Sequence, residues 1–212
     1  MLLPGLYLVT PDWPDTAALL AAVSAVLPSR PALVQYRNKL ADAALKREQA
    51  GRLLAACRAA GVPLVINDDL ALAIEIGADG AHLGRDDGDP AAARRALGAG
   101  RILGVSCYDE WSRAVAGAAA GVDYVAFGAM FPSPTKPAAV LAPLELLGRA
   151  RHELGLPVVA IGGITLDNAR LLVAAGADLL AVISDVFSAP DPAARAAAYV
   201  GLFDSPHQEI PA

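Results

Sequence analysis

Short apolar runs rich in β-branched residues alternate along this chain with Ala- and Leu-rich stretches whose apolar residues recur at helical spacing. The first such pair consists of Leu6 to Val9 and the stretch from Asp15 to Leu27, and the pair recurs eight times. The runs predict strands at 6–9, 32–37, 62–66, 80–83, 102–106, 123–127, 157–161 and 179–183. The stretches between them predict helices centred near residues 21, 50, 73, 94, 115, 148, 171 and 197.

This alternation predicts an α/β fold, a single (β/α)8 TIM barrel with parallel strands and an outer ring of helices. Dividing 212 residues by eight leaves about 26 per unit, so most connections must be tight. No linker, charge block or shift in composition marks a second domain. We therefore expect one TIM-barrel domain over residues 1–212, with a flexible tail over about 205–212.

Glycines 61, 77, 121 and 176 each stand where a predicted helix ends and a strand follows, and glycine readily supplies the left-handed cap there. Asp79, Asp123 and Asp178 lie in these segments, at the amino-terminal ends of strands. That face of a TIM barrel serves stability, so we exclude the three aspartates from the candidate site.

Composition narrows the function further. With 55% hydrophobic and 18% charged residues, the chain can bury a large core. A net charge of −5 without a Lys/Arg run argues against nucleic acid or an anionic membrane as the main partner and favours small molecules.

The sequence shows no secretory leader and no apolar stretch of about 18 residues, so we expect a cytoplasmic protein. Cys57 and Cys107 lack metal or redox spacing and are expected to be reduced core residues, although Cys107 follows Ser106.

Polar residues gather where the apolar runs stop. In parallel strands these positions share one rim of the sheet, where α/β enzymes place their active sites, so the clusters predict one site built from many segments. The clusters are 35–39, 67–69, 82–87, Ser106, 128–136, Gly162-Gly163 and Ser184.

Gln35 and Arg37 point to one face of the second predicted strand, and Lys39 continues that row. Arginine offers a fork suited to phosphate oxygens, lysine a mobile charge, and glutamine an amide that can bind the edge of a heterocycle. The alternative is a structural Arg37 paired with a core carboxylate.

Asp68 and Asp87 follow neighbouring predicted strands. Two carboxylates without a cysteine or a paired histidine suit Mg²⁺, a hard cation that keeps waters and takes phosphate oxygens. The nearby aspartates 69, 86 and 89 could instead be solvated or cap helices. Asn67 could position a ligand oxygen or hold the turn at Asp68, and His82 could be a core histidine or a catalyst.

Gly162-Gly163 and Ile183-Ser184 follow the last two predicted strands, where barrels often bind phosphate through backbone N–H groups and a short helix. A second anion site would combine Arg37, Lys39 and Lys136 with the metal. Two anion sites fit two substrates, and a polyphosphate held by cations is a leaving group, which indicates group transfer. The proline-rich loop from Phe131 to Pro143 is expected to act as a lid.

Taken in order, these motifs resemble the thiamine-phosphate synthase family over nearly the whole chain. The matching segments are Gln35-Tyr36-Arg37-Asn38-Lys39, Asn67-Asp68-Asp69, His82-Leu83-Gly84 with Asp87, Gly104-Val105-Ser106, Gly128-Ala129-Met130-Phe131-Pro132-Ser133-Pro134-Thr135-Lys136 and Ile161-Gly162-Gly163-Ile164.

The resemblance implies an enzyme that joins hydroxymethylpyrimidine diphosphate to a thiazole phosphate, carboxylated or not, and releases diphosphate and thiamine phosphate. It implies that Asp68 and Asp87 bind Mg²⁺. It assigns catalytic roles to Arg37, Lys39, Ser106 and Lys136. The substrate-binding residues that it implies are Gln35, Arg37, Lys39, Asn67, Ser106, Ser133, Thr135, Lys136, Gly163, Ile183 and Ser184. The expected partners are these small molecules, and a homo-oligomer is compatible with the sequence.

The chain departs from the family pattern at three positions. Arg85 stands where glutamine is usual and could bind diphosphate or pair with Asp87. Ser133 replaces a common threonine, and Asp185 replaces a small residue beside the phosphate site, so we expect its carboxylate to point away from that site. Two other functions remain open: a thiazole tautomerase of the same superfamily, which shares the fold but not the diphosphate and metal residues, and a non-catalytic sensor of thiamine intermediates.

Overall fold

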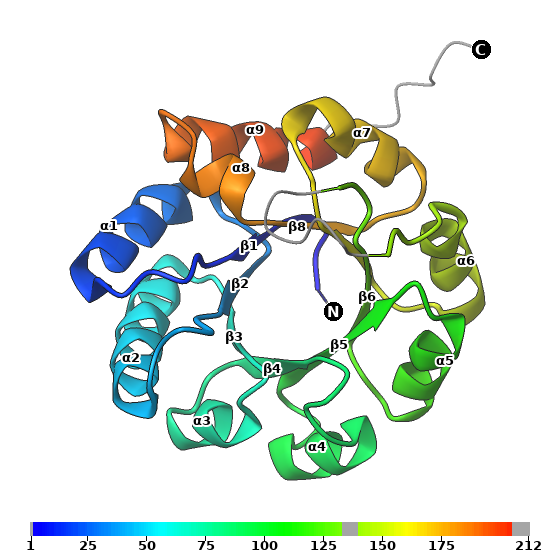
Figure 1. The fold of residues 1–212 in the computed structure, drawn as a ribbon, viewed down its shortest axis with the longest axis horizontal. Helices are drawn as coiled ribbons and strands as arrows, with labels where there is room; N and C mark the ends of the chain where they lie inside the picture. Colours follow the sequence, from blue (N-terminus) through cyan, green and yellow to red (C-terminus); the bar gives the residue numbers. More distant parts are fainter. Residues whose placement is uncertain (1, 133–139, 205–212) are drawn as a thin grey trace.

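The computed structural model describes residues 2–132 and 140–204, and within them eight parallel strands close into a barrel in chain order (Figure 1). Each strand pairs with its neighbour in sequence, and β8 returns to pair with β1. The predicted TIM barrel is confirmed. The strands are β1 (Gly5–Val9), β2 (Leu33–Tyr36), β3 (Leu64–Asn67), β4 (Gly80–Leu83), β5 (Ile102–Tyr108), β6 (Tyr124–Phe127), β7 (Val158–Ile161) and β8 (Leu179–Val182).

Helices surround the barrel, and each predicted helix centre lies inside a helix of the structure (Figure 1). A short helix, α8, follows β8 directly and precedes the last helix. The helices are α1 (Thr16–Val26), α2 (Ala43–Ala60), α3 (Leu70–Glu75), α4 (Pro90–Leu97), α5 (Trp111–Ala119), α6 (Glu145–Leu154), α7 (Leu166–Ala174), α8 (Ser184–Phe187) and α9 (Pro192–Asp204), with a 3-10 turn at Leu27–Ser29.

Burial divides the apolar side chains into two layers, as the alternation of side chains along each strand requires. One layer fills the barrel interior and includes Tyr7, Leu33, Val65 and Tyr124. The other lies between the strands and the helices. Because the interior layer is closed with large side chains, a ligand must bind at one end of the barrel and not through it.

The amino-terminal face of the barrel carries the three aspartates that we excluded from the site. The carboxylates of Asp79 and Asp178 accept hydrogen bonds from the backbone N–H groups of Leu64 and Val158, at 2.8 and 2.9 Å. Asp123 does the same for β5 and also pairs with Arg94 of α4. These carboxylates hold the starts of neighbouring strands, so their predicted structural role is confirmed.

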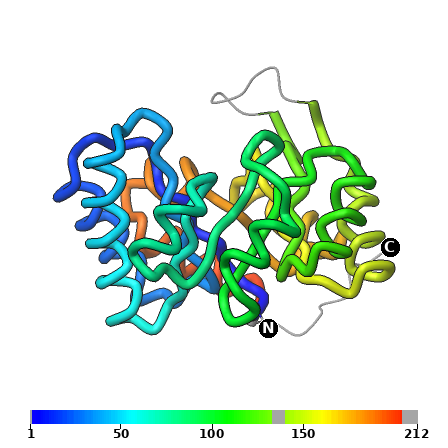
Figure 2. The backbone as a smooth tube through the Cα atoms, turned by 90° about the horizontal axis from the view of Figure 1, so that it is seen from below, coloured from blue at the N-terminus to red at the C-terminus, as the bar shows by residue number. Residues whose placement is uncertain are grey.

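The opposite face carries the long β6–α6 connection, and Figure 2 shows the chain rising from this face at 130–132 and returning at 140–142. The Phe131 N–H donates to the Gly162 carbonyl at 3.1 Å, and the Ala142 N–H donates to the Ala129 carbonyl at 2.8 Å. The outgoing flank is thus anchored on the β7–α7 loop, and the returning flank is anchored on the outgoing one. Residues 133–139, in the middle of the expected lid, and the expected tail at 205–212 lie outside the described residues.

Among the residues that the structure describes, no helix is both long and apolar enough to cross a membrane.

Candidate functional site

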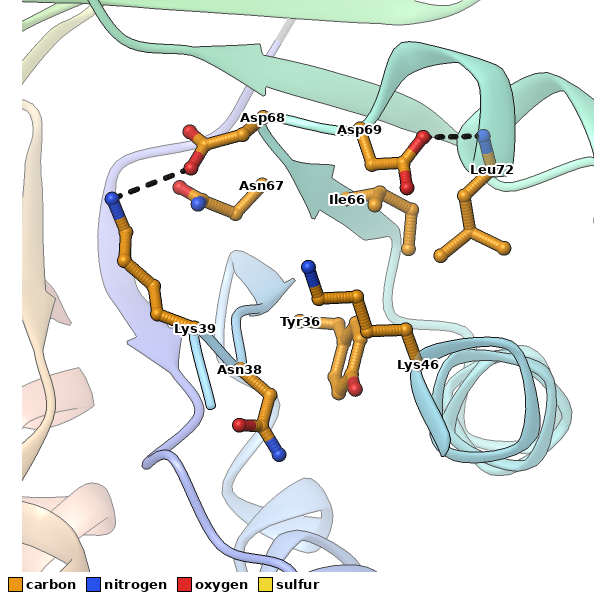
Figure 3. Close-up of a pocket in the computed structure, with 9 residues that line it drawn as sticks. All are labelled: Tyr36, Asn38, Lys39, Lys46, Ile66, Asn67, Asp68, Asp69 and Leu72. Atoms are coloured by element: carbon orange, nitrogen blue, oxygen red, sulfur yellow. Dashed lines mark hydrogen bonds and ion pairs between the residues drawn. The ribbon is translucent and has the colours of Figure 1, made fainter. Parts of the chain in front are cut away.

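A small pocket opens at the carboxyl ends of β2 and β3 (Figure 3). The Lys39 ammonium group lies 3.4 Å from the Asp68 carboxylate. Lys46 reaches the same pocket from α2, so two cationic groups flank it. Its lining consists of Tyr36, Asn38, Lys39, Lys46, Ile66, Asn67, Asp68, Asp69 and Leu72.

Arg37 stands beside this pocket and is held by Asp12, from the β1–α1 connection. Its Nη1 lies 2.9 and 2.7 Å from the two carboxylate oxygens of Asp12. The same carboxylate accepts the backbone N–H of Lys39 at 2.8 Å. The Arg37 and Asp12 side chains are 20% and 29% exposed, so this pair lies at the rim and not in the core. Arg37 is therefore paired, but with a carboxylate at the rim and not with the core carboxylate of the alternative interpretation.

The carboxylates of Asp68 and Asp87 converge on Gly84. A Cβ atom at Gly84 would lie 2.7 Å from Asp87 Oδ2 and 3.8 Å from Asp68 Oδ1. Burial, followed by the neighbouring Asp68 carboxylate, raises the pKa of Asp87, while the Gly84 N–H and Lys39 act in the opposite direction. Within residues 2–132 and 140–204, no three His, Cys, Asp or Glu side chains gather as a metal cluster. The structure thus brings the Asp68 and Asp87 carboxylates together at Gly84, as a pair without a third such side chain among the described residues.

Asp68 has a backbone φ of +63°, a left-handed conformation that is uncommon for residues other than glycine. Its N–H donates to the His82 carbonyl at 2.8 Å, which ties the end of β3 to β4. Such conformations persist where the surrounding structure enforces them and often mark functional sites. The turn therefore fixes the Asp68 carboxylate toward the mouth of the barrel.

Two of the neighbouring aspartates cap helices. Asp69 accepts the Leu72 N–H at 2.9 Å at the start of α3. Asp89 accepts the Ala91 and Ala92 N–H groups at the start of α4. Their carboxylates are used locally, which separates them from Asp68 and Asp87.

Gln35, His82 and Ser106 belong to one hydrogen-bonded group in the barrel interior. The two ring nitrogens of His82 lie 2.9 Å from Tyr124 Oη and 2.9 Å from Ser106 Oγ. Burial lowers the pKa of His82 to about 4, so its imidazole is neutral near pH 7. Gln35 Nε2 donates to the Tyr7 hydroxyl. His82 is thus a satisfied buried histidine that also contacts a predicted site residue.

The predicted phosphate pocket lies at the ends of β7 and β8. Gly163 has φ +65°, and a Cβ atom there would lie 2.5 Å from the Phe131 carbonyl oxygen, so only glycine fits against the incoming loop. Ile183 and Ser184 begin α8. The remaining predicted residues, Ser133, Thr135 and Lys136, lie outside the described residues.

Comparison with known proteins identifies the family. Residues 6–186 match the family model for thiamine monophosphate synthase. The chain is 67% identical over 203 residues to the thiamine-phosphate synthase of Aromatoleum aromaticum, covering 96% of this chain and 98% of that protein. It is 68% identical to the thiamine-phosphate synthase of an Azoarcus species, covering 94% and 97%. The chain belongs to the thiamine monophosphate synthase family. It is therefore a member of a family of transferases of thiamine biosynthesis, as the resemblance predicted.

Solved structures agree with this placement. The thiamine phosphate pyrophosphorylase of Pyrococcus furiosus superposes with a TM-score of 0.83 at 29% identity and covers 94% of this chain and 95% of its own. A 3-hexulose-6-phosphate synthase superposes with a TM-score of 0.69 at 21% identity, covering 93% and 99%, a likeness that shows the fold alone.

Two departures from the family pattern are now placed. The Arg85 guanidinium pairs with Glu110 and lies 4.7 Å above the Tyr108 ring, so it does not pair with Asp87. The Asp185 carboxylate accepts the Tyr199 hydroxyl at 2.7 Å and lies 3.1 Å from Arg195, both on α9. Asp185 is thus engaged by the outer helix layer, in agreement with the expectation that it points away from the phosphate site.

The sequence interpretation missed Asp12, Lys46, Tyr7 and Tyr124. Asp12 follows β1, so the strand-end pattern contained the signal for it. Lys46 lies on α2, where a charged residue normally indicates a solvated face. The two tyrosines occupy apolar runs, and nothing in the sequence distinguishes them from ordinary core aromatics.

Proposed function

We propose that this chain couples hydroxymethylpyrimidine diphosphate with a thiazole phosphate to give thiamine phosphate and diphosphate. The observation that supports it most strongly is the meeting of Lys39, Asp68 and Asp87 at the carboxyl ends of β2 to β4. Arg37 stands at the same rim, two residues before Lys39 and paired with Asp12. Two bases and two carboxylates at one rim suit a diphosphate with a divalent cation. The family's shared activity supports the same reaction.

Asp68 and Asp87 would hold Mg²⁺. The donor set fits this ion, because carboxylate oxygens are its preferred protein ligands and two of them leave positions for phosphate oxygens and water. Burial and then the neighbouring Asp68 carboxylate raise the pKa of Asp87, and a bound cation would favour the charged form of both carboxylates. When bound, Mg²⁺ would neutralise negative charge on the diphosphate.

The chain's own cations act on the leaving group. Arg37, Lys39 and Lys136 would stabilise the diphosphate as the bond between the pyrimidine methylene carbon and the ester oxygen breaks. The electron pair leaves on that oxygen, the aminopyrimidine delocalises the positive charge, and the thiazole nitrogen attacks the methylene carbon. Gln35, Asn67 and Ser106 would position the pyrimidine diphosphate. The reaction needs no covalent enzyme intermediate.

The thiazole phosphate would bind between the β6–α6 and β7–α7 loops. Gly163, Ile183 and Ser184 would supply backbone contacts to its phosphate, and Ser133 and Thr135 would supply hydroxyl groups. The anchoring of Phe131 on Gly162 supports this arrangement, because it joins the two loops that carry these residues. The long loop would exclude water from the positively charged pyrimidine methylene group.

The direct test is product formation from both substrates with Mg²⁺, following thiamine phosphate and diphosphate together. Equal appearance of both products is the expected result. A folded protein that binds thiazole phosphate but releases no diphosphate would contradict the proposal, and thiazole isomerisation without coupling would indicate a tautomerase. Reaction mixtures lacking either substrate are the controls.

A further inference from the structure

Five polar side chains form a hydrogen-bonded line through the interior of the barrel. Gln35 Nε2 donates to Tyr7 Oη, and Tyr7 Oη lies 2.6 Å from Tyr124 Oη. Tyr124 Oη lies 2.9 Å from His82 Nδ1, and His82 Nε2 lies 2.9 Å from Ser106 Oγ. The line joins β2, β1, β6, β4 and β5. Its two ends, Gln35 and Ser106, are predicted substrate contacts, whereas the three members between them have no role in the proposed reaction.

The line has one direction, which follows from counting protons. A tyrosine hydroxyl has a single proton to donate. Tyr7 accepts from Gln35, and among the described residues the Tyr124 hydroxyl is the one acceptor within reach of the Tyr7 proton, so that proton goes to Tyr124. The Tyr124 proton then goes to His82 Nδ1. His82 Nδ1 is therefore unprotonated, and the imidazole is neutral with its proton on Nε2. That proton is donated to Ser106 Oγ, which leaves the Ser106 proton for an acceptor outside the line.

The line is closely packed. Tyr7, Tyr124 and His82 are 1%, 0% and 6% exposed, and the His82 ring stacks on Tyr124 with centroids 5.6 Å apart. A Cβ atom at Gly104 would lie 1.9 Å from the Tyr124 ring, so the glycine creates the space that the ring fills. Burial raises the pKa of both tyrosines and lowers that of His82 to about 4, which keeps all three neutral.

Ser106 ends the line beside the carboxylate loop. Arg113 Nε donates to the Ser106 carbonyl at 3.2 Å, and Arg113 Nη2 lies 3.5 Å from the Gly84 carbonyl oxygen. The Gly84 N–H in turn binds Asp87 at 2.7 Å. One arginine therefore connects the backbone of Ser106 to the loop that carries a predicted metal ligand. Ser106 thus lies on the side of the rim where the proposed function would place the diphosphate.

We propose that Tyr7, Tyr124 and His82 are positioning residues that hold Ser106 as a hydrogen-bond donor toward the ester oxygen between the pyrimidine methylene and the diphosphate. The identity of this acceptor rests on the proposed function. Ser106 keeps its proton while the carbon–oxygen bond breaks and the electron pair leaves on the ester oxygen. Because negative charge grows on that oxygen, the hydrogen bond strengthens in the transition state and acts on kcat more than on KM.

The tautomer of His82 tests the line without any substrate. In the substrate-free protein, ¹⁵N-detected correlation spectra of the imidazole groups distinguish a proton on Nε2 from one on Nδ1. The His82 signals are assigned by their loss in His82→Gln, and exposed His152 serves as the internal control, assigned by His152→Gln. A neutral ring with its proton on Nε2 near pH 7 is the expected result. A proton on Nδ1, or a charged imidazolium, would reverse or break the line and overturn the proposal.

A double-mutant cycle then tests whether the line acts through Ser106. We expect Tyr124→Phe to lower kcat about tenfold, the equivalent of one hydrogen bond, with little change in KM for the pyrimidine diphosphate. The double variant Tyr124→Phe/Ser106→Ala should be no slower than Ser106→Ala. Tyr199→Phe, which removes a buried hydroxyl from α9, is the matched control and should keep wild-type kcat.

The outcomes separate the two proposals. The positioning role would be contradicted, even in an active synthase, if Tyr124→Phe and Ser106→Ala lowered kcat by factors that multiply in the double variant. It would also be contradicted if Tyr124→Phe raised KM and left kcat unchanged. Absence of coupling activity together with a proton on His82 Nε2 would contradict the proposed function and leave the direction of the line intact. If Tyr124→Phe fails to fold, the tautomer of the wild-type protein still decides the direction.

Discussion

Asp12 holds Arg37 in place at the mouth of the barrel, with Nη1 of Arg37 at 2.9 and 2.7 Å from the two carboxylate oxygens. Asp12 also accepts the Lys39 N–H, so one side chain fixes the backbone and guanidinium of the row that follows β2. An arginine already oriented by a carboxylate loses less side-chain entropy when it binds an anion. The pair thus prepares the site before the diphosphate arrives.

Substitution of Asp12 should weaken this preparation. We expect Asp12→Ala to lower kcat/KM for the pyrimidine diphosphate by roughly 10- to 100-fold, because hydrogen bonds to charged groups are lost and Arg37 becomes mobile. Steady-state kinetics measure the effect. Glu75→Ala is the control, since it removes the carboxylate partner of Arg47 on the outer surface, and it should leave kcat/KM unchanged. Equal kinetics for Asp12→Ala and the wild type would show that Arg37 needs no such support.

Removal of the Arg37 guanidinium should lower activity more than removal of the Asp12 carboxylate. Arg37→Ala is expected to lower kcat by about 10²–10³-fold, since charge on the departing diphosphate loses a preorganised donor. Arg37→Lys should recover only part of this rate, because lysine keeps the charge but lacks the planar fork. Single-turnover measurements of diphosphate release separate this effect from product dissociation. Wild-type turnover in Arg37→Ala would remove the residue from the mechanism.

Chelation tests the carboxylate pair. EDTA should abolish coupling and Mg²⁺ should restore it, and Mg²⁺ should raise the thermal midpoint of the substrate-free protein, because a ligand of the folded state stabilises it. The rise should disappear in Asp68→Asn and Asp87→Asn and persist in Asp86→Asn, which changes an exposed neighbour. Full activity in EDTA, or an unchanged Mg²⁺ effect in both variants, would exclude the pair as the metal site.

The architecture was predictable because its signals are local. A strand buried on both faces needs a continuous apolar run, and a helix that covers it needs apolar residues at helical spacing, so eight alternating segments were sufficient for the barrel. The face carrying the site followed from the same rule, since every polar cluster came after a run. Asp79, Asp123 and Asp178 were separated from the site by this rule alone, and the structure confirms their structural role.

The partners of the site residues were not predictable, because they depend on contacts between segments distant in sequence. Arg37 and Asp12 are 25 residues apart, and Tyr7 and Tyr124 are 117 residues apart. The strand pattern placed Asp68 and Asp87 just after neighbouring strands. Only the fold shows that Asp69 and Asp89 cap helices while the other two carboxylates meet at Gly84. Spacing in sequence cannot distinguish these uses of the same residue type.

The buried His82 predicts a loss of stability in mild acid. The pKa of its imidazole is lowered to about 4 in the folded protein, from about 6.5 in the unfolded chain, by burial. Between these values the unfolded chain binds the proton and the folded protein does not, so the free energy of unfolding falls as pH falls from about 6.5 toward 4, by at most about 1.4 kcal/mol per pH unit. Above pH 6.5 this contribution is constant.

Urea unfolding of the wild type and His82→Gln across this pH range measures the effect. The wild type should lose stability relative to His82→Gln as the solution is acidified. His152→Gln, which changes an exposed histidine, should follow the wild type at every pH. Parallel curves for the wild type and His82→Gln would mean that the pKa of His82 is the same in the folded and unfolded states, contrary to the effect of its burial.

A side chain at Gly104 should destabilise the barrel interior, because the glycine leaves the space that the Tyr124 ring occupies. A Cβ atom at Gly104 would lie 1.9 Å from the Tyr124 ring, so Gly104→Ala must displace that ring and its hydrogen bonds. We expect the free energy of unfolding to fall by about 1–3 kcal/mol. Gly51→Ala meets no atom within 4 Å inside α2 and should instead stabilise the protein by about 0.5–1 kcal/mol, because alanine favours the helix. Urea unfolding of both variants separates crowding at the ring from a general effect of replacing glycine. If Gly104→Ala were as stable as the wild type, Tyr124 would be free to move, and the line from Gln35 to Ser106 would not be rigid.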